Sequence, residues 1–328
     1  MMLKFVLLNT NGTYSHALQY IGIKNAFEQL KGECVLDFIE VNITEQDGPK
    51  IYNYDPSFIF AISPLCAGLR VWKKRAKKVI CFDTESIYEN LGKDTIPYCD
   101  ILANVDKFGT EFYTKYVDNN KIKCKIYHMP LGFCPSMYRF QNVEDKYKAD
   151  VTMAGVLFDK RRKIVEQLHS IKNEFSLRLI TPKDWANRII HADSVTFLHR
   201  EVLSPEEMIK YYCGSKIILC VNRDYSPANL LGLQSTTPGR VFQETACRRM
   251  VMIDRSRPEI FDYFEDGKEI VTFDDNNPEE LKEKILYYLS HDEEREAIAH
   301  NGYVRTMKEN TWKTRIQKLL EFVNHEQI

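Results

Sequence analysis

The sequence has no excess of charge and no long apolar run. Its 328 residues include 45 Lys and Arg against 46 Asp and Glu, which gives a formal net charge of −1. A chain so balanced has no global field that would attract nucleic acid or an anionic membrane surface. The opening run MMLKFVLLNT is too short for a signal peptide or a membrane span, and no other stretch could cross a bilayer. We therefore expect a cytoplasmic protein without a transmembrane segment.

Several signatures of metal, disulfide and cofactor sites are also missing. The nine Cys residues are scattered, their number is odd, and none forms a C-x-x-C pair. This pattern favours reduced thiols over a disulfide framework or a zinc site. Neither a G-x-G-x-x-G fingerprint nor a G-K-[ST] loop occurs, which excludes the common dinucleotide and P-loop signatures. The sequence thus predicts no bound metal and no resident cofactor.

The chain does contain two series of apolar runs that alternate with helical patterns. A length of 328 residues suits two domains, each able to bury a core. Continuous apolar strands between helices predict doubly wound parallel sheets. We expect an N-terminal Rossmann-like domain over 1–138, a Gly/Pro-bearing linker over 139–148 and a second Rossmann-like domain over 149–310. The expected strands are 3–9, 34–41, 57–63, 78–83, 99–105 and 124–130, then 149–155, 175–181, 194–200, 215–222, 250–254 and 268–273.

The most informative stretch is TTPGRVFQETACRRMVMID, residues 236–254. Thr237 can cap a helix that begins at Pro238, and Gly239 lets a ligand approach the backbone. The free N–H groups of such a first turn favour an anion. Arg240, Gln243 and Glu244 share one face, where Arg suits a phosphate and Gln or Glu suits ribose hydroxyls. The stretch therefore predicts a nucleoside-diphosphate site, and the alternative is an ordinary amphipathic helix between two strands.

A second cluster of cations follows the strand at 149–155. Gly155 ends that strand, and Lys160 and Arg161 begin the next helix. Cations at a helix start oppose its dipole unless an anion is present, so Lys160 or Arg161 is predicted to reach the diphosphate. The alternative is a solvated helix start. Asn222, which ends a later strand, is either a further donor contact or part of a simple turn.

The 236–254 stretch resembles the R-x-F-E-x-x-A-C-G segment of CgeB-like (spore maturation protein B-like) glycosyltransferases. The resemblance continues through RPEIFDYFEDGKEIVTF, PEELKEKILYYLSHDEEREAIAHNGYVR and TWKTRIQKLLEF, and so covers most of 215–323. Gln243 stands at the family Glu, with Glu244 one place later, and Arg248 stands at the family Gly. The ribose contact therefore stays open between Gln243 and Glu244.

The resemblance implies an α/β GT-B fold, in which two Rossmann-like domains face each other across a cleft. It also implies that the C-terminal helix, 311–328, crosses back to the first domain. The expected function is transfer of a sugar from a nucleotide sugar, a UDP-sugar in the first instance, to an acceptor hydroxyl. The acceptor is left open among a glycan, a protein, a polymer and a modified nucleic acid. The resemblance also implies a hexosyltransferase, and the absence of a D-x-D motif is consistent with one that needs no metal.

Two side chains of the first domain are candidates for catalysis. His16 follows the first strand, and Asp83 ends the strand 78–83. Either could act as a base or position the transferred sugar. The alternatives are a polar surface histidine and a helix-capping Asp83. Two other functions also stay open, namely a nucleotide-sugar epimerase of similar fold and a non-catalytic sugar- or nucleotide-binding module.

Overall fold

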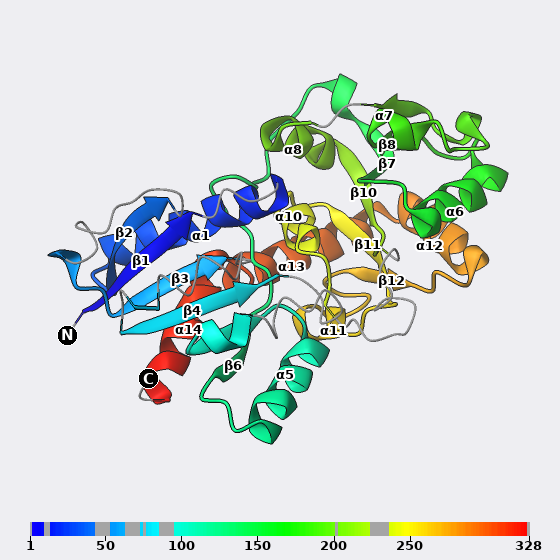
Figure 1. Ribbon diagram of the computed structural model, residues 1–328. Coiled ribbons are helices and arrows are strands. Elements are labelled where there is room, and N and C mark those ends of the chain that lie inside the picture. The colour runs from blue at the N-terminus through cyan, green and yellow to red at the C-terminus, as the bar shows by residue number, and fades with distance from the viewer. Residues whose placement is uncertain are drawn as a thin grey trace. The chain divides into compact units, whose positions relative to one another are not determined.

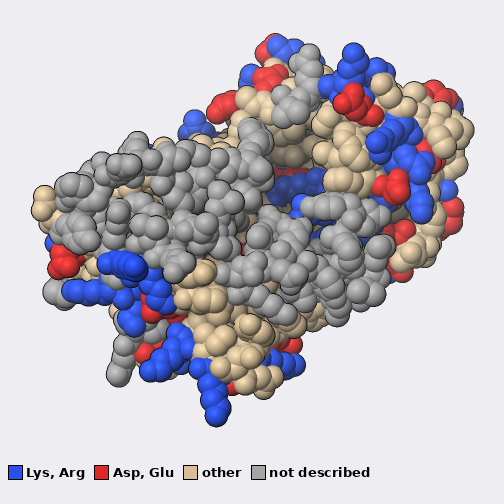
Figure 2. All heavy atoms as spheres, viewed as in Figure 1, with Lys and Arg blue, Asp and Glu red and all other residues tan. Residues whose placement is uncertain are grey.

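The computed structural model describes residues 2–9, 14–42, 53–62, 73–74, 77–84, 95–200, 203–223 and 236–326, with the backbone alone at 14–16. The chain divides into two compact units. The first comprises Met1–Cys134, Gly232–Thr236 and Thr311–Ile328, and the second comprises Pro135–Leu231 and Thr237–Asn310. Within the described residues no helix is long and apolar enough to cross a membrane. On the face shown in Figure 2, basic and acidic side chains are mixed, as the balanced composition predicts.

The first unit contains a six-stranded parallel sheet (Figure 1). Its strand order is β2-β1-β3-β4-β5-β6. Most residues of the central strands are fully buried, which is why they are continuous apolar runs in the sequence. The elements are β1 (Leu3–Asn9), α1 (Tyr14–Gly32), β2 (Leu36–Asn42), β3 (Phe58–Ile62), β4 (Lys78–Asp83), η2 (Ile96–Tyr98), β5 (Ile101–Asn104), α5 (Lys107–Asn119), β6 (Lys125–His128) and α14 (Trp312–His325).

The C-terminal helix α14 packs against α1 of the first unit, which confirms the expected crossing back. Thr311 caps the helix by accepting a hydrogen bond from Thr314 N at 3.1 Å. The Trp312 ring then lies over Gly22, where a Cβ would be 2.3 Å from Trp312 Cδ1. Trp312 also meets Phe82 edge to face, with the ring centroids 5.9 Å apart. Glycine on α1 is therefore required for the tryptophan to fit.

The second unit repeats the parallel plan, with strand order β12-β11-β10-β7-β8-β9. Some of its helices begin with a side-chain cap, for example Ser204 Oγ, which accepts from Glu207 N at 3.3 Å. The elements are η3 (Asp145–Tyr147), β7 (Ala149–Ala154), α6 (Asp159–Gln167), η4 (Leu168–Ile171), β8 (Leu177–Ile180), α7 (Lys183–Ala186), η5 (Ala192–Ser194), β9 (Phe197–His199), α8 (Pro205–Cys213), β10 (Ser215–Cys220), α10 (Arg240–Ala246), β11 (Met250–Asp254), α11 (Ile260–Tyr263), β12 (Val271–Phe273), α12 (Pro278–Ser290) and α13 (Asp292–Glu309). The doubly wound fold predicted from the alternating runs is confirmed in both units.

One predicted helix starts later than expected. The sequence predicted a start at Pro238, but α10 begins at Arg240. Val241 N donates to Pro238 O at 3.0 Å and Phe242 N to Gly239 O at 3.2 Å. These bonds join residues three apart, so the chain makes a tight turn before the helix. With only seven residues, α10 offers little dipole to an anion, so a phosphate would be bound by side chains rather than by the helix start.

Candidate functional site

Two arginine side chains converge on Gly155, at the carboxyl end of β7. A Cβ at Gly155 would lie 2.8 Å from Arg240 Nη1 and 2.9 Å from Arg161 Nη1. Gly155 has a φ of +123°, a backbone conformation that side-chain-bearing residues rarely adopt. The glycine therefore permits both the turn after β7 and the close approach of two guanidinium groups.

Main-chain carbonyls hold the two arginines in place. Arg161 donates through Nε to Val221 O at 2.9 Å and through Nη1 to Val156 O at 2.9 Å. Arg240 donates through Nη1 to Ala154 O at 2.7 Å and through Nη2 to Val221 O at 2.5 Å. Because both side chains share Val221 O, the segment after β10 fixes their spacing. The pair is thus preorganised at the carboxyl ends of β7 and β10, the edge where open α/β sheets bind ligands.

The arginine pair places two positive charges in a poorly solvated setting. Arg161 is 6% exposed, and burial, together with the charge of Arg240, lowers the pKa of its guanidinium to about 9. Burial also opposes the charge of Arg240, but the neighbouring Cys220 and Glu244 side chains outweigh it and raise the pKa of Arg240. An anion placed beside both groups would relieve their repulsion and replace lost solvation.

Glu244 lies beneath Arg240 rather than on an open face. It is 1% exposed, and its Oε1 lies 3.8 Å from Arg240 Nε. Burial raises the pKa of Glu244, whereas Arg240, Cys220 and Tyr212 act in the opposite direction. Neither Glu244 Oε2 nor Arg240 Nε has a hydrogen-bond partner within the described residues. Glu244 is therefore placed to orient Arg240, and the direct ribose contact considered for it has no open surface in this structure.

Lys160 turns toward a different group of side chains, at the end of β11. Its Nζ donates to Asp254 Oδ1 at 2.7 Å and to Ser256 Oγ at 2.9 Å, and pairs with Asp275 Oδ2 at 2.8 Å. Asn222 joins the same cluster, because its N lies 2.6 Å from Asp254 Oδ2 and its Nδ2 lies 2.9 Å from Asp254 Oδ1. The structure thus brings Lys160 and Asn222 together around Asp254, whereas Arg161, the neighbour of Lys160, faces Gly155.

The remaining predicted residues fall into two groups. In the second unit, Thr237 is buried, and Gly239 and Gln243 are partly exposed at the start and middle of α10. In the first unit, Asp83 is buried at the end of β4 and accepts from Asn104 Nδ2 at 3.1 Å. The side chain of His16 lies outside the described residues.

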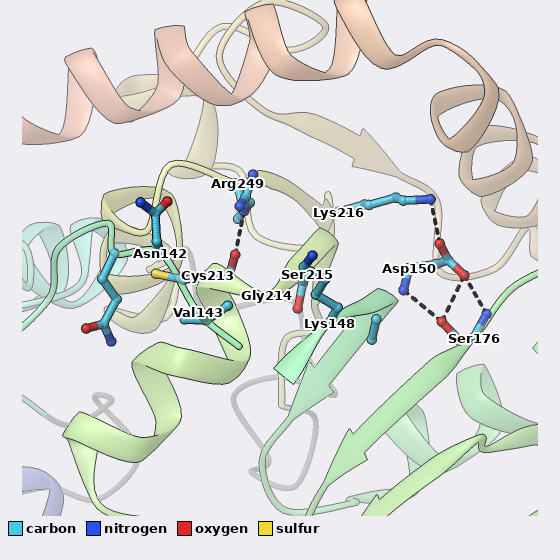
Figure 3. Close-up of a pocket in the computed structure, with 12 residues that line it drawn as sticks. Asn142, Val143, Lys148, Asp150, Ser176, Cys213, Gly214, Ser215, Lys216 and Arg249 are labelled. Carbon is cyan, nitrogen blue, oxygen red and sulfur yellow. Dashed lines mark hydrogen bonds and ion pairs between the residues drawn. The ribbon is translucent and has the colours of Figure 1, made fainter. Parts of the chain in front are cut away.

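A polar pocket occupies the opposite, amino-terminal edge of the second sheet. It has a volume of about 480 Å³ and is lined at the starts of β7 and β10. Figure 3 shows Arg249, which donates to Cys213 O at 2.8 Å, and Lys216, which points toward Asp150 at 2.8 Å. None of the predicted donor residues lines this pocket. Its cations pair with carboxylates, Arg249 with Glu296 at 3.7 Å, and no two of them converge on one point as Arg161 and Arg240 do at Gly155.

Sequence reasoning missed two residues of the site. Asp254 ends an apolar strand, and an acid in that position is the signal that could have identified it. Cys220, the last residue of β10, is buried against Arg240 and Glu244. No sequence signal marks it, because a cysteine within an apolar run also fits an ordinary core.

Comparisons with known proteins identify similar sequences and similar folds. Residues 160–321 match the family described as glycosyl transferase-like. Spore protein CgeB of Bacillus subtilis is 21% identical over 231 residues, 68% of each chain. A structure of HepE from Anabaena in complex with UDP aligns over 99% of this chain and 100% of its own, with a TM-score of 0.65 and 12% identity. A glycosyltransferase from Rickettsia africae aligns over 99% and 98%, with a TM-score of 0.66 and 13% identity.

The aligned structures span both units, and the family match covers the α6 to α14 region that contains most of the predicted donor residues. Residues 160–321 therefore match the glycosyl transferase-like family, the chain is similar to spore protein CgeB, and its fold is GT-B.

Proposed function

We propose that the protein transfers a hexosyl group from a UDP-sugar to an acceptor hydroxyl, without a divalent ion. The observation that carries the proposal is the pair of guanidinium groups beside Gly155. Two adjacent cations at the carboxyl edge of a parallel sheet suit the two negative phosphates of a nucleoside diphosphate. HepE, which was crystallised with UDP and with UDP-glucose, supports this choice of nucleotide.

The arginines would act mainly on the leaving group. Departure of UDP from the sugar adds negative charge to the β-phosphate, and donors that are already in place stabilise that charge without reorganisation. Main-chain carbonyls hold Arg161 and Arg240, so neither side chain has to be ordered during the reaction. Arg240 Nε is buried without a hydrogen-bond partner among the described residues and lies 3.8 Å from Glu244 Oε1, so a ligand would meet the terminal nitrogens. Fixed cations of this kind can replace the Lewis acid that a metal would supply.

The same site offers contacts to the rest of the nucleotide. We assign the ribose hydroxyls to Gln243, which is partly exposed on α10, and assign to Glu244 the task of orienting Arg240. Lys160 and Asn222, which both form hydrogen bonds with Asp254, would lie beside the bound diphosphate. An amide can donate to and accept from hydroxyl groups, so Gln243 retains the hydrogen-bonding role of a carboxylate at that position.

Acceptor chemistry is assigned to the first unit, with Asp83 and His16 as the candidate base or sugar-positioning groups. Asp83 ends a strand of the parallel sheet at its carboxyl edge, where such groups gather. The acceptor hydroxyl could belong to a glycan, a protein, a polymer or a modified nucleic acid.

A panel of nucleoside diphosphates and UDP-sugars tests the proposal. We expect UDP and a UDP-sugar to raise the melting temperature, because a ligand that binds only the native state stabilises it. Release of UDP from a UDP-hexose should follow, and the sugar should appear on water or on an added acceptor. Stabilisation without any turnover would instead indicate a binding module, and recovery of an isomerised nucleotide sugar would indicate an epimerase.

A further inference from the structure

Two histidines and an aspartate lie together on the second unit, apart from the arginine pair. His169 belongs to η4, and His191 and Asp193 belong to the segment at η5, which contacts η4. Each residue offers a ligand atom, and these atoms all lie within 4.8 Å of one another. Within the described residues this is the one cluster of metal-ligating side chains with such a spacing. None of its members is among the predicted donor residues.

The geometry of the cluster is partly fixed. The rings of His169 and His191 are stacked, with centroids 4.2 Å apart and 22° between their planes. His169 Nδ1 lies 3.7 Å from Asp193 Oδ1 and 2.9 Å from the hydroxyl oxygen of the buried Ser194. His169 is 33% exposed at its side chain and Asp193 is 60% exposed. The His169 ring is thus held by the buried Ser194 hydroxyl, whereas the exposed side chains of His191 and Asp193 can change their rotamers.

The chemistry of the three side chains suits a borderline transition metal. Zn²⁺ accepts imidazole nitrogen and carboxylate oxygen in a tetrahedral shell, and three protein ligands leave one position for water. With Zn–N distances near 2.0–2.1 Å, two ligands of one ion are about 3.3 Å apart. The distances between the ligand atoms of the three residues must therefore shorten by roughly 1.5 Å at most. Rotation of the exposed His191 ring out of the stack can supply this movement.

We propose that His169, His191 and Asp193 form a surface zinc site that joins η4 to the η5 segment. Lys172 currently pairs with Asp193, so an arriving cation must displace its ammonium group. The bound ion would cross-link two segments that precede β9, the edge strand of the sheet. Its role would be structural, because the cluster shares no residue with the arginine pair.

Titration of the metal-free full chain with Zn²⁺, against a chromophoric chelator of known affinity, tests the proposal. We expect one equivalent to bind and the melting temperature to rise with zinc. His191→Ala and Asp193→Asn should each weaken binding by roughly tenfold or more, which is the scale of losing about 1.4 kcal/mol. Lys172→Gln should tighten binding, because it removes the competing cation. His325→Ala, which alters an exposed histidine of α14, should leave the affinity unchanged.

Two results would overturn the proposal. The first is a wild-type chain that takes up no zinc in competition with the chelator. The second is zinc uptake that survives His191→Ala and Asp193→Asn undiminished, which would locate the ion elsewhere, for example on the free thiols. His191 and Asp193 are both exposed, so their substitution should not unfold the unit. The melting temperature of each variant without zinc checks this directly.

Discussion

Replacement of Arg240 by Gln is the sharpest test of the donor site. Gln keeps a hydrogen-bonding amide but removes the positive charge that the diphosphate requires. Hydrogen bonds to charged groups contribute about 1.5–3 kcal/mol. UDP affinity should therefore fall by roughly 10- to 150-fold, since 1.4 kcal/mol corresponds to a factor of ten. Calorimetric titration with UDP measures this loss.

The substitution also affects stability, and the structure indicates how to separate the two effects. Without Arg240, the buried Glu244 loses the cation 3.8 Å away, and Ala154 O and Val221 O lose donors. Loss of one partner of a buried pair costs up to about 3–5 kcal/mol, and less here because Arg240 is 17% exposed. The double variant Arg240→Gln/Glu244→Gln should recover part of the stability but none of the UDP affinity.

Arg249→Gln provides the control. Arg249 is also partly buried and also donates to a main-chain carbonyl, but it lies at the opposite edge of the same sheet. Its substitution should leave UDP affinity unchanged. If Arg240→Gln were to bind UDP as tightly as the wild type while remaining folded, the arginine pair would not be the diphosphate site.

Four further predictions concern chemistry and stability. Sugar transfer should persist in excess chelator, and loss of activity that Mg²⁺ or Mn²⁺ restores would refute metal independence. His16→Ala and Asp83→Asn should lower turnover at saturating donor while UDP affinity stays near wild type, whereas normal turnover in both would place catalysis elsewhere. Trp312→Ala should cost about 3–5 kcal/mol of unfolding free energy in urea, and a loss below 1 kcal/mol would contradict the packing on α1. The Arg255 guanidinium lowers the pKa of Glu280 from 4.5 to about 2. Ionised Glu280 therefore contributes to the folding stability of the protein fully above pH 4.5, and this contribution is lost as the pH falls toward 2. The stability difference between wild type and Glu280→Gln, of roughly 1 kcal/mol or less for a partly solvated pair, should shrink over that range rather than stay constant.

Local sequence determined the secondary structure and its order. Strands buried on both faces are apolar at nearly every position, so runs such as KVICFD and MVMID identify β4 and β11 directly. Capping is local as well, and Ser204 and Asn277 begin α8 and α12 with side-chain hydrogen bonds to residues three further on. The start of α10 was harder to predict from the sequence, because a tight turn and a first helical turn use the same residue types.

Tertiary structure decided which of the cations meet. Lys160 and Arg161 are adjacent, but consecutive helical residues point about 100° apart, so only packing could direct Arg161 to Gly155 and Lys160 to Asp254. Glu244 was considered for a ribose contact, yet the fold buries its side chain beside Cys220 and Tyr212. His169 and His191 are far apart in sequence and match no metal motif, so only the contact between η4 and η5 brings them together. The hydrophobic periodicity of the sequence indicates which side chains each segment buries. A binding site depends on which segments become neighbours, and the packing of the whole unit decides this.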